Sequence, residues 1–327
     1  MRVLVTGGGG YIGSHMVLDL VDRGERPVVL DNLSTGFRQA LPAGVEFIVG
    51  DCGDTDLVRT LMEKHAVDAI IHFAGSIVVA ESIADPLGYY FNNTVKSRAL
   101  LEAAVACGVR SFIFSSTAAV YGSASAAPIA EDAPLAPISP YGWSKLMTEI
   151  MLADAARAHG LRYVILRYFN VAGADPKGRS GQSTPRATHL IKVACETALG
   201  RRSHIEVFGT DYPTPDGTCV RDYIHVSDLA YAHTAALDHL RAGGTSDVFN
   251  CGYSKGYSVL EVIEAVKRAA GRDFEVRPAG RRAGDPPSLV AQSSKIRAVL
   301  GWKPRYDDLD RIVADALAWE KRLVGSW

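Results

Sequence analysis

Residues 3–13 read Val-Leu-Val-Thr-Gly-Gly-Gly-Gly-Tyr-Ile-Gly, an apolar run that ends in a glycine-rich turn. The run predicts a short buried strand, and the apolar spacing from Tyr11 to Arg23 predicts a helix directly after the turn. Glycines between a strand and a helix allow a tight turn and let backbone amides approach a pyrophosphate at the helix N-terminus. Because such turns also occur for purely structural reasons, the context decides the interpretation.

The next strand supplies that context. Residues 28–30 form a second apolar run, and Asp31 closes it 18 residues after Gly13. An acid at about this distance can hydrogen-bond the ribose diol of a dinucleotide, and it disfavours a 2′-phosphate. We therefore expect NAD rather than NADP, with a plain loop residue as the alternative interpretation of Asp31.

Strands and helices alternate through the first half of the chain. Apolar runs predict strands over 45–49, 69–72, 112–114 and 163–166, and helical spacing predicts helices over 56–65, 100–107 and 141–159. Such alternation indicates an α/β fold, a doubly wound parallel sheet of the Rossmann type covered by helices on both faces. We expect this NAD-binding domain to span residues 1–169, with a return of the chain over 222–250.

The pattern is less regular after residue 170. Polar, glycine-rich stretches over 175–185 and 211–217 predict loops. A strand is predicted over 205–208, and helices are predicted over 188–199, 228–240 and 259–270. We expect residues 170–327 to form mainly a smaller mixed α/β substrate domain, with the substrate in the cleft between the two domains.

A second informative stretch is Tyr141-Gly-Trp-Ser-Lys145, preceded by Ser139-Pro140. Serine caps helix amides and proline suits the first helical position, so a helix begins here with Tyr141 and Lys145 on one face. The helix N-terminus and the ammonium both favour phenolate. Lowering a tyrosine pKa from about 10 to about 7 requires roughly 4 kcal/mol and would give a general base near neutral pH.

Composition narrows the class of protein. The 327 residues are 47% hydrophobic and 22% charged, with a net charge of −1, as in a soluble globular protein with a large core. We expect no membrane span and no signal peptide, and the balanced charge gives no general attraction to nucleic acid. Five scattered cysteines without a C-x-x-C pair indicate a reduced, cytoplasmic chain without a metal site.

The glycine turn together with the tyrosine–lysine pair resembles the extended short-chain dehydrogenase/reductases. Longer blocks resemble one branch of them, the UDP-glucose 4-epimerase family, and they lie at residues 31–34, 72–75, 114–117, 167–170, 209–218 and 221–226. The resemblance implies interconversion of UDP-glucose and UDP-galactose at C4 through a 4-keto sugar, with NAD taking and returning the hydride. It also implies that Tyr141 is the acid and base, assisted by Lys145 and by Thr117, where the family usually has serine.

The resemblance assigns further positions one by one. The cofactor would be held by Gly7, Gly10, Tyr11, Ile12, Gly13, Asp31, Asn32, Asp51, Cys52, Phe73, Ala74, Gly75, Asn93, Tyr141, Lys145 and Phe169. The UDP-sugar would contact Thr117, Asn170, His189, Phe208, Arg221, Arg282, Asp285 and Leu289. Two arginines suit a diphosphate because their planar forks bind oxygens in pairs.

Three positions depart from the family pattern. Ile77 replaces a lysine near the cofactor, which removes one charged contact from a chain that we expect to retain NAD on purification. His189 replaces an asparagine and can still donate one hydrogen bond. Leu289 replaces a tyrosine, which leaves more room beside the sugar. We take His72 to be structural.

Several alternatives stay open at this point. The substrate could be another UDP-sugar, such as an N-acetylhexosamine, a pentose or a uronate. A nucleotide-sugar 4,6-dehydratase would need an acid and a base directly after Thr117, where this chain has Ala118 and Ala119. A non-catalytic NAD-binding protein would not need the tyrosine base. The family is commonly a homodimer, and the helices over 90–107 and 141–159 are the candidate contacts.

Overall fold

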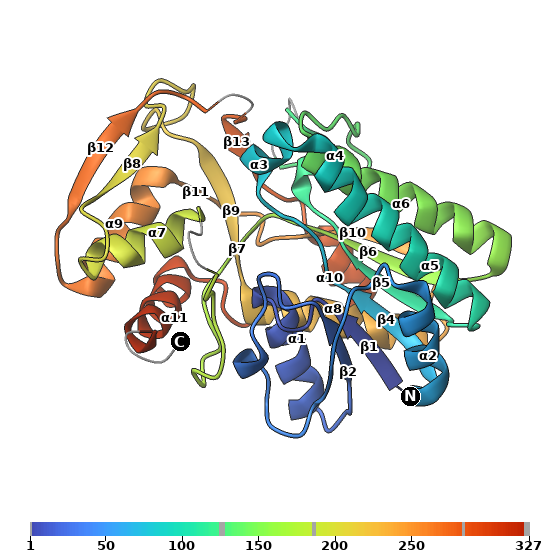
Figure 1. Cartoon of the computed structure of the whole chain (residues 1–327). Helices are drawn as coiled ribbons and strands as arrows, with labels where there is room; N and C mark the ends of the chain where they lie inside the picture. Colours follow the sequence, from blue (N-terminus) through green and yellow to red (C-terminus); the bar gives the residue numbers. More distant parts are fainter. Residues whose placement is uncertain (1, 124–127, 185–187, 283–284, 324–327) are drawn as a thin grey trace.

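The computed structural model describes residues 2–123, 128–184, 188–282 and 285–323, and a parallel sheet of seven strands lies at its centre (Figure 1). In spatial order the strands are β10 (Asp247–Cys251), β6 (Arg162–Tyr168), β5 (Ser111–Ser115), β4 (Val67–His72), β1 (Arg2–Thr6), β2 (Val28–Asp31) and β3 (Glu46–Val49). The order reverses between β1 and β4, and such a switch point leaves a ligand crevice at the carboxyl ends of the strands. The predicted fold class is confirmed.

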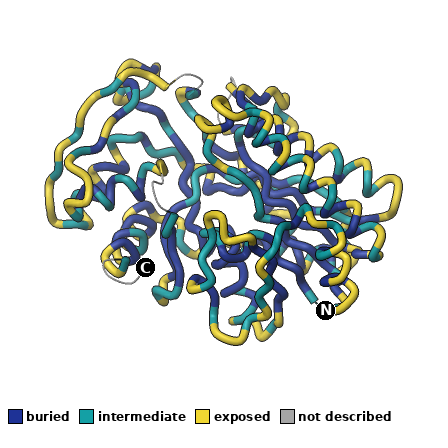
Figure 2. The backbone as a smooth tube through the Cα atoms, in the orientation of Figure 1, coloured by how far each residue is buried: buried dark blue, intermediate teal, exposed yellow. Residues whose placement is uncertain are grey.

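Helices cover both faces of the sheet, and successive side chains of each strand point to opposite faces. Val3 and Val5 pack in the core on one face, under α1 (Tyr11–Asp22) and α8 (Val226–Arg241). Leu4 packs in the core on the other face, under α2 (Thr55–His65), α5 (Lys96–Ala106) and α6 (Pro140–His159). The edge strand β3 is exposed or only partly buried, whereas Figure 2 shows the other strands of the sheet as mostly buried. These strands therefore read as continuous apolar runs in the sequence.

Helix α6 begins as the sequence predicts. Ser139 is its N-cap and accepts a hydrogen bond from the Gly142 N–H at 3.2 Å, and Pro140 is its first residue. Gly160, with φ of +71°, ends the helix in a left-handed cap. Helix α5 begins at Lys96, earlier than the predicted residue 100, because a π-helical turn over Tyr90–Val95 leads into it. Two short helices, α3 (Val79–Ala84) and α4 (Pro86–Tyr89), precede that turn.

The second half forms a smaller region at the left of Figure 1. A four-stranded sheet contains β7 (Asn170–Ala172), β9 (Val220–His225), β11 (Gly256–Ser258) and β13 (Ser288–Leu289), and a separate pair contains β8 (His204–Phe208) and β12 (Glu275–Ala279). Its helices are α7 (Leu190–Ala198), α9 (Val259–Ala270) and α11 (Leu309–Arg322), whereas α10 (Ser294–Leu300) packs against α8 and β10 of the first region. One hydrophobic core runs from the large sheet into this region, so the two regions share their packing.

The chain returns to the large sheet late. Helix α8 covers its first face and β10 is its edge strand, whereas β9 pairs within the smaller sheet. These two elements run from Val226, where α8 begins, to Cys251, where β10 ends, and they lie over the predicted return at 222–250. We propose that residues 1–169 and this returning segment form one domain, and that the rest of residues 170–327 forms the other.

Three observations concern a membrane-spanning helix, the state of the cysteines and a metal site. No helix within the described residues is long and apolar enough to cross a membrane. The five cysteines are free thiols, and the described part of the chain contains no group of three or more His, Cys, Asp or Glu side chains that could hold a metal ion. His72 is buried between Thr6 Oγ1 at 2.6 Å and Ser97 Oγ at 2.8 Å, in agreement with a structural role.

Candidate active site

The glycine turn between β1 and α1 leaves no room for a side chain at Gly7 or Gly13. Gly7 has φ of +70°, and a Cβ added to Gly13 would lie 2.2 Å from the Gly7 carbonyl oxygen. The N-cap residue of α1, Gly10, offers no side chain to the first-turn amides. Uncapped amides at a helix N-terminus bind anions such as a pyrophosphate, so this turn fits a dinucleotide.

Asp31 is held directly against this turn. Its carboxylate accepts hydrogen bonds from the N–H groups of Gly9 and Leu33, both at 2.8 Å. Asp51, after β3, accepts one from Lys96 Nζ at 2.6 Å, and Asn32 donates to the same carboxylate at 3.3 Å. The predicted adenosine-side residues therefore gather at the ends of β2 and β3. Next to them, burial raises the pKa of the Cys52 thiol to about 12, so it stays neutral.

The opposite wall of the crevice follows β4. Phe73, Ala74 and Gly75 leave the strand here, and a Cβ on Gly7 would lie 2.6 Å from the Ala74 nitrogen. Asn93, on the π-helical turn, accepts from the Ser76 N–H at 2.7 Å and donates to Ser144 Oγ at 3.0 Å. Asn93 thus joins the loop after β4 to helix α6, beside the predicted catalytic residues.

The remaining predicted cofactor residues lie on three different elements. The Tyr11 hydroxyl donates to the Gly173 carbonyl at 2.7 Å, which connects α1 to the strand β7. Ile12 packs against the core of the first face, and Ile77 is about half exposed, with no charge to offer. Phe169 is buried in a small third cluster that also contains Ala118 and has Leu289 packed against it.

The three predicted catalytic residues meet at the carboxyl end of β5. Thr117 follows this strand, and its hydroxyl is hydrogen-bonded to Tyr141 in the first turn of α6. Lys145 Nζ donates to the Ser115 carbonyl at 3.0 Å and lies 4.9 Å from the centre of the Phe114 ring. All three side chains are at least nine-tenths buried. A proton acceptor, a hydroxyl partner and a cation thus face one crevice.

The pKa expectation for Tyr141 was wrong for the chain alone. Burial raises the pKa of Tyr141 above its ordinary value of 10, and the hydrogen bond from Thr117 opposes this only in part. Burial likewise lowers the pKa of Lys145 to about 8, against the charge of Glu149. The desolvation of the buried phenolate outweighs the helix terminus and the ammonium, so the neutral phenol is the favoured form of Tyr141 in the chain alone.

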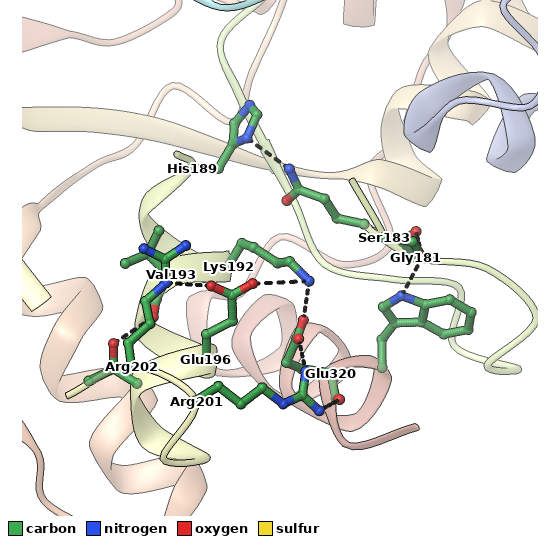
Figure 3. A network of polar contacts seen from close by, with 12 residues as sticks. Gly181, Ser183, His189, Lys192, Val193, Glu196, Arg201, Arg202 and Glu320 are labelled. Atoms are coloured by element: carbon green, nitrogen blue, oxygen red, sulfur yellow. Dashed lines mark hydrogen bonds and ion pairs between the residues drawn. The ribbon is translucent and has the colours of Figure 1, made fainter. Parts of the chain in front are cut away.

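The predicted substrate residues form two groups. Asn170 and His189 line one small cavity between β7, α7 and α11, and Gln182 Nε2 lies 2.8 Å from His189 Nδ1. Figure 3 shows His189 above the ion pairs of Lys192 with Glu320 and Glu196. The Lys192–Glu320 ion pair fastens α7 to the C-terminal helix α11, whereas the Lys192–Glu196 pair lies within α7.

The second group lies on β8, β9, β13 and the segment between β12 and β13. Arg221 is 3.5 Å from Asp285, and Leu289 pairs with Arg221 in the parallel register of β13 and β9. The Arg282 guanidinium stacks on the Phe208 ring at 3.7 Å. Residues 283 and 284 lie outside the described part of the chain.

Sequence reasoning missed two kinds of residue here. Gln182 sits in a polar loop with no motif to mark it. Glu149 and Arg167 form a buried ion pair at 2.6 Å behind Lys145; the signals were the four-residue spacing between Lys145 and Glu149 and the place of Arg167 at the start of the block 167–170.

The fold and the site together define the class of protein: a Rossmann-type fold with a glycine turn suited to a dinucleotide and a tyrosine–lysine pair at the neighbouring crevice. Residues 3–252 match the family described as the NAD dependent epimerase/dehydratase family. The UDP-glucose 4-epimerase of Azospirillum brasilense is 59% identical over 99% of this chain and 93% of its own length. This chain therefore belongs to the NAD dependent epimerase/dehydratase family, in its UDP-glucose 4-epimerase branch.

Solved structures agree with this assignment. The UDP-Glc/GlcNAc 4-epimerase of Campylobacter jejuni is 50% identical with a TM-score of 0.86, covering 98% of this chain and 99% of that one. The UDP-glucose 4-epimerase of Bifidobacterium longum, in complex with NAD⁺ and UDP, is 37% identical with a TM-score of 0.94, and the match covers 100% of both chains.

Proposed function

We propose that this chain interconverts UDP-glucose and UDP-galactose by inverting C4 of the sugar. The observation that carries the proposal is the meeting of Tyr141, Lys145 and Thr117 at the crevice beside the glycine turn. NAD, when bound, accepts the C4 hydride, returns it, and brings a positive ring that favours phenolate. Because the hydride returns, the reaction has no net oxidation and needs no second substrate.

Each residue of the site has a stated task in this proposal. Tyr141 takes the proton of the 4-hydroxyl and gives it back after the 4-keto sugar has turned in the cleft. Thr117 holds the 4-oxygen and the Tyr141 hydroxyl in one hydrogen-bonded chain. Lys145 keeps a positive charge beside both, which stabilises the negative charge that develops on oxygen.

The diphosphate needs donors, and the second region supplies them. Arg221 and Arg282 carry the fixed positive charge, and His189 and Asn170 line the neighbouring cavity. Phe208 offers its ring to the uracil, which requires Arg282 to leave the position it holds over that ring. Asp285 is then free to accept from the ribose. No partner nucleic acid or membrane enters this proposal, and we place the enzyme in the cytoplasm.

Other reactions fit the site less well. A dehydratase needs an acid and a base after Thr117, and Ala118 and Ala119 can be neither. A related epimerisation of UDP-N-acetylglucosamine remains a second candidate, because Leu289 has no aromatic ring to fill the space beside the sugar. This substrate matches the Campylobacter jejuni relative.

We further propose a homodimer joined through α6 and the elements beside it. Large apolar side chains are exposed on α3, α4, the π-helical turn and α6, which pack against one another: Val79, Ile83, Leu87, Phe91, Val95, Trp143, Met147 and Ile150. Contiguous exposed apolar surface of this kind marks an interface. Ile150→Glu should give monomers in analytical ultracentrifugation, whereas a dimer of unchanged strength would contradict this face.

Substitution of the proton acceptor tests the proposed reaction. Tyr141→Phe should retain NAD and lose turnover of UDP-galactose by about 10²–10⁴-fold, the usual value of general acid–base catalysis. Tyr163→Phe, on β6 and away from the crevice, is the control and should turn over normally. A Tyr141→Phe enzyme with nearly normal kcat would overturn the assignment.

A further inference from the structure

A buried ion pair stands directly behind the proposed catalytic residues. Glu149 lies on α6 four residues after Lys145, and Arg167 lies on the adjacent strand β6. Arg167 Nη2 is 2.6 Å from Glu149 Oε2, and Arg167 Nε lies 3.1 and 3.2 Å from the two carboxylate oxygens. Both side chains are 5% exposed. Removing two charges from water is costly, so such a pair needs an explanation beyond stability.

Each member of the pair also holds the chain beside Thr117. The Ser116 hydroxyl donates to Glu149 Oε1 at 2.5 Å, directly before Thr117. Arg167 Nη1 donates to the Tyr121 hydroxyl at 3.0 Å. Tyr121 ends a 3-10 turn, Ala118–Tyr121, for which Thr117 is the N-cap. The ion pair therefore fixes the backbone on both sides of Thr117.

The same anchor acts on the lysine. Lys145 Nζ donates to the carbonyl of Ser115, the residue before Ser116. A shift of Ser116 would move this acceptor and the Thr117 hydroxyl together, relative to Tyr141 on α6. Because Glu149 is itself on α6, its hydrogen bond with Ser116 ties this helix to the carboxyl end of β5. Displacements of about 1 Å in such an arrangement can cost roughly 10²-fold in rate.

We propose that Glu149 and Arg167 are positioning residues of the reaction, which hold Ser116 and Tyr121 on either side of Thr117 and so set Thr117 and Lys145 against Tyr141. This inference rests on the proposed epimerase function. Neither side chain touches the substrate, so the effect must appear in kcat far more than in KM.

Ser116→Ala is the most selective test, because it removes one link and leaves the ion pair in place. We expect kcat for UDP-galactose to fall about 10-fold or more, with KM changed less than about twofold and with unchanged bound NAD and Tm. Ser111→Ala removes a serine hydroxyl from the start of the same strand and should turn over as the unmodified enzyme does. Normal kcat in Ser116→Ala would overturn the proposal.

A second variant separates positioning from folding. Glu149→Leu with Arg167→Met replaces the pair by apolar side chains, an exchange that often preserves or raises stability. We expect a Tm at or above that of the unmodified enzyme together with a kcat reduced at least as much as in Ser116→Ala. Recovery of both Tm and kcat would show that the pair serves folding alone. If the unmodified enzyme does not turn over UDP-galactose at all, the proposed function fails instead, and that outcome is visible before any variant is made.

Discussion

Gly13→Ala should abolish tight NAD binding, because the new methyl group strikes the backbone of the glycine turn. Its Cβ would lie 2.2 Å from the Gly7 carbonyl oxygen and 2.8 Å from the Gly8 Cα. To reach an ordinary contact of 3.4 Å, the turn must move by about 1.2 Å. Neither neighbour is a flexible side chain, so the turn itself has to open.

This displacement can be converted into affinity. A shift of this size takes a backbone amide out of hydrogen-bonding range of a phosphate oxygen. Hydrogen bonds to charged groups contribute roughly 1.5–3 kcal/mol each, so losing two costs about 3–6 kcal/mol. The NAD dissociation constant should therefore rise by about 10²–10⁴-fold.

Two quantities are measured for each variant and for the unmodified enzyme. The NAD content after purification is measured by release and enzymatic quantification, and the NAD dissociation constant by titration calorimetry. Gly10→Ala is the matched control in the same turn, because its Cβ would lie 3.2 Å from the same carbonyl oxygen and needs a shift of about 0.2 Å. It should weaken NAD binding by less than about 10-fold. Equal NAD binding in the Gly13→Ala and unmodified enzymes, or a larger loss in Gly10→Ala, would refute the steric argument.

Two further predictions concern substrate range and pH. The unmodified enzyme should turn over UDP-N-acetylglucosamine at least slowly, and Leu289→Tyr should suppress this reaction more than that of UDP-galactose; equal suppression of both would contradict the role of Leu289. Burial lowers the pKa of His15 and His233 from 6.5 to about 4, and that of His72 from 6.5 to about 3. Below pH 6.5 the unfolded chain therefore binds more protons than the folded chain, and the stability of the fold falls as the pH drops. Burial also lowers the pKa of His189, which adds to this trend. Asp222, whose pKa burial raises to about 6, acts in the opposite direction, as do Asp19 and Asp307, whose pKa values burial also raises. A Tm that does not fall between pH 6.5 and about pH 4.5 would contradict this balance.

The sequence predicted the parallel sheet well because its strands are buried on both faces. Such strands read as unbroken apolar runs between glycines and charged residues, and the start of α6 was marked by its own capping residues, Ser139 and Pro140. In the second half, β7, β11 and β13 are two or three residues long. Strands this short carry no periodicity, since their place is fixed by pairing with β9.

The site was predictable where a motif places the residue, and less so where the environment decides its chemistry. Spacing brought Tyr141 and Lys145 to one helix face, but the raised pKa of Tyr141 follows from burial by residues distant in sequence. Glu149 and Arg167 are likewise joined only when α6 packs on β6. Contacts between distant segments are what a single sequence does not display.

The late return of the chain to the large sheet has a consequence for synthesis. About 80 residues separate the end of β6 from β10, the strand that pairs with it at the edge of the sheet. At about 5–20 residues per second, a ribosome needs roughly 4–16 s to make them. Throughout that interval the edge of β6 has no strand to pair with, and an unpaired edge is where nascent chains associate wrongly. Covering this edge until the returning strand emerges would therefore protect the growing polypeptide from such association.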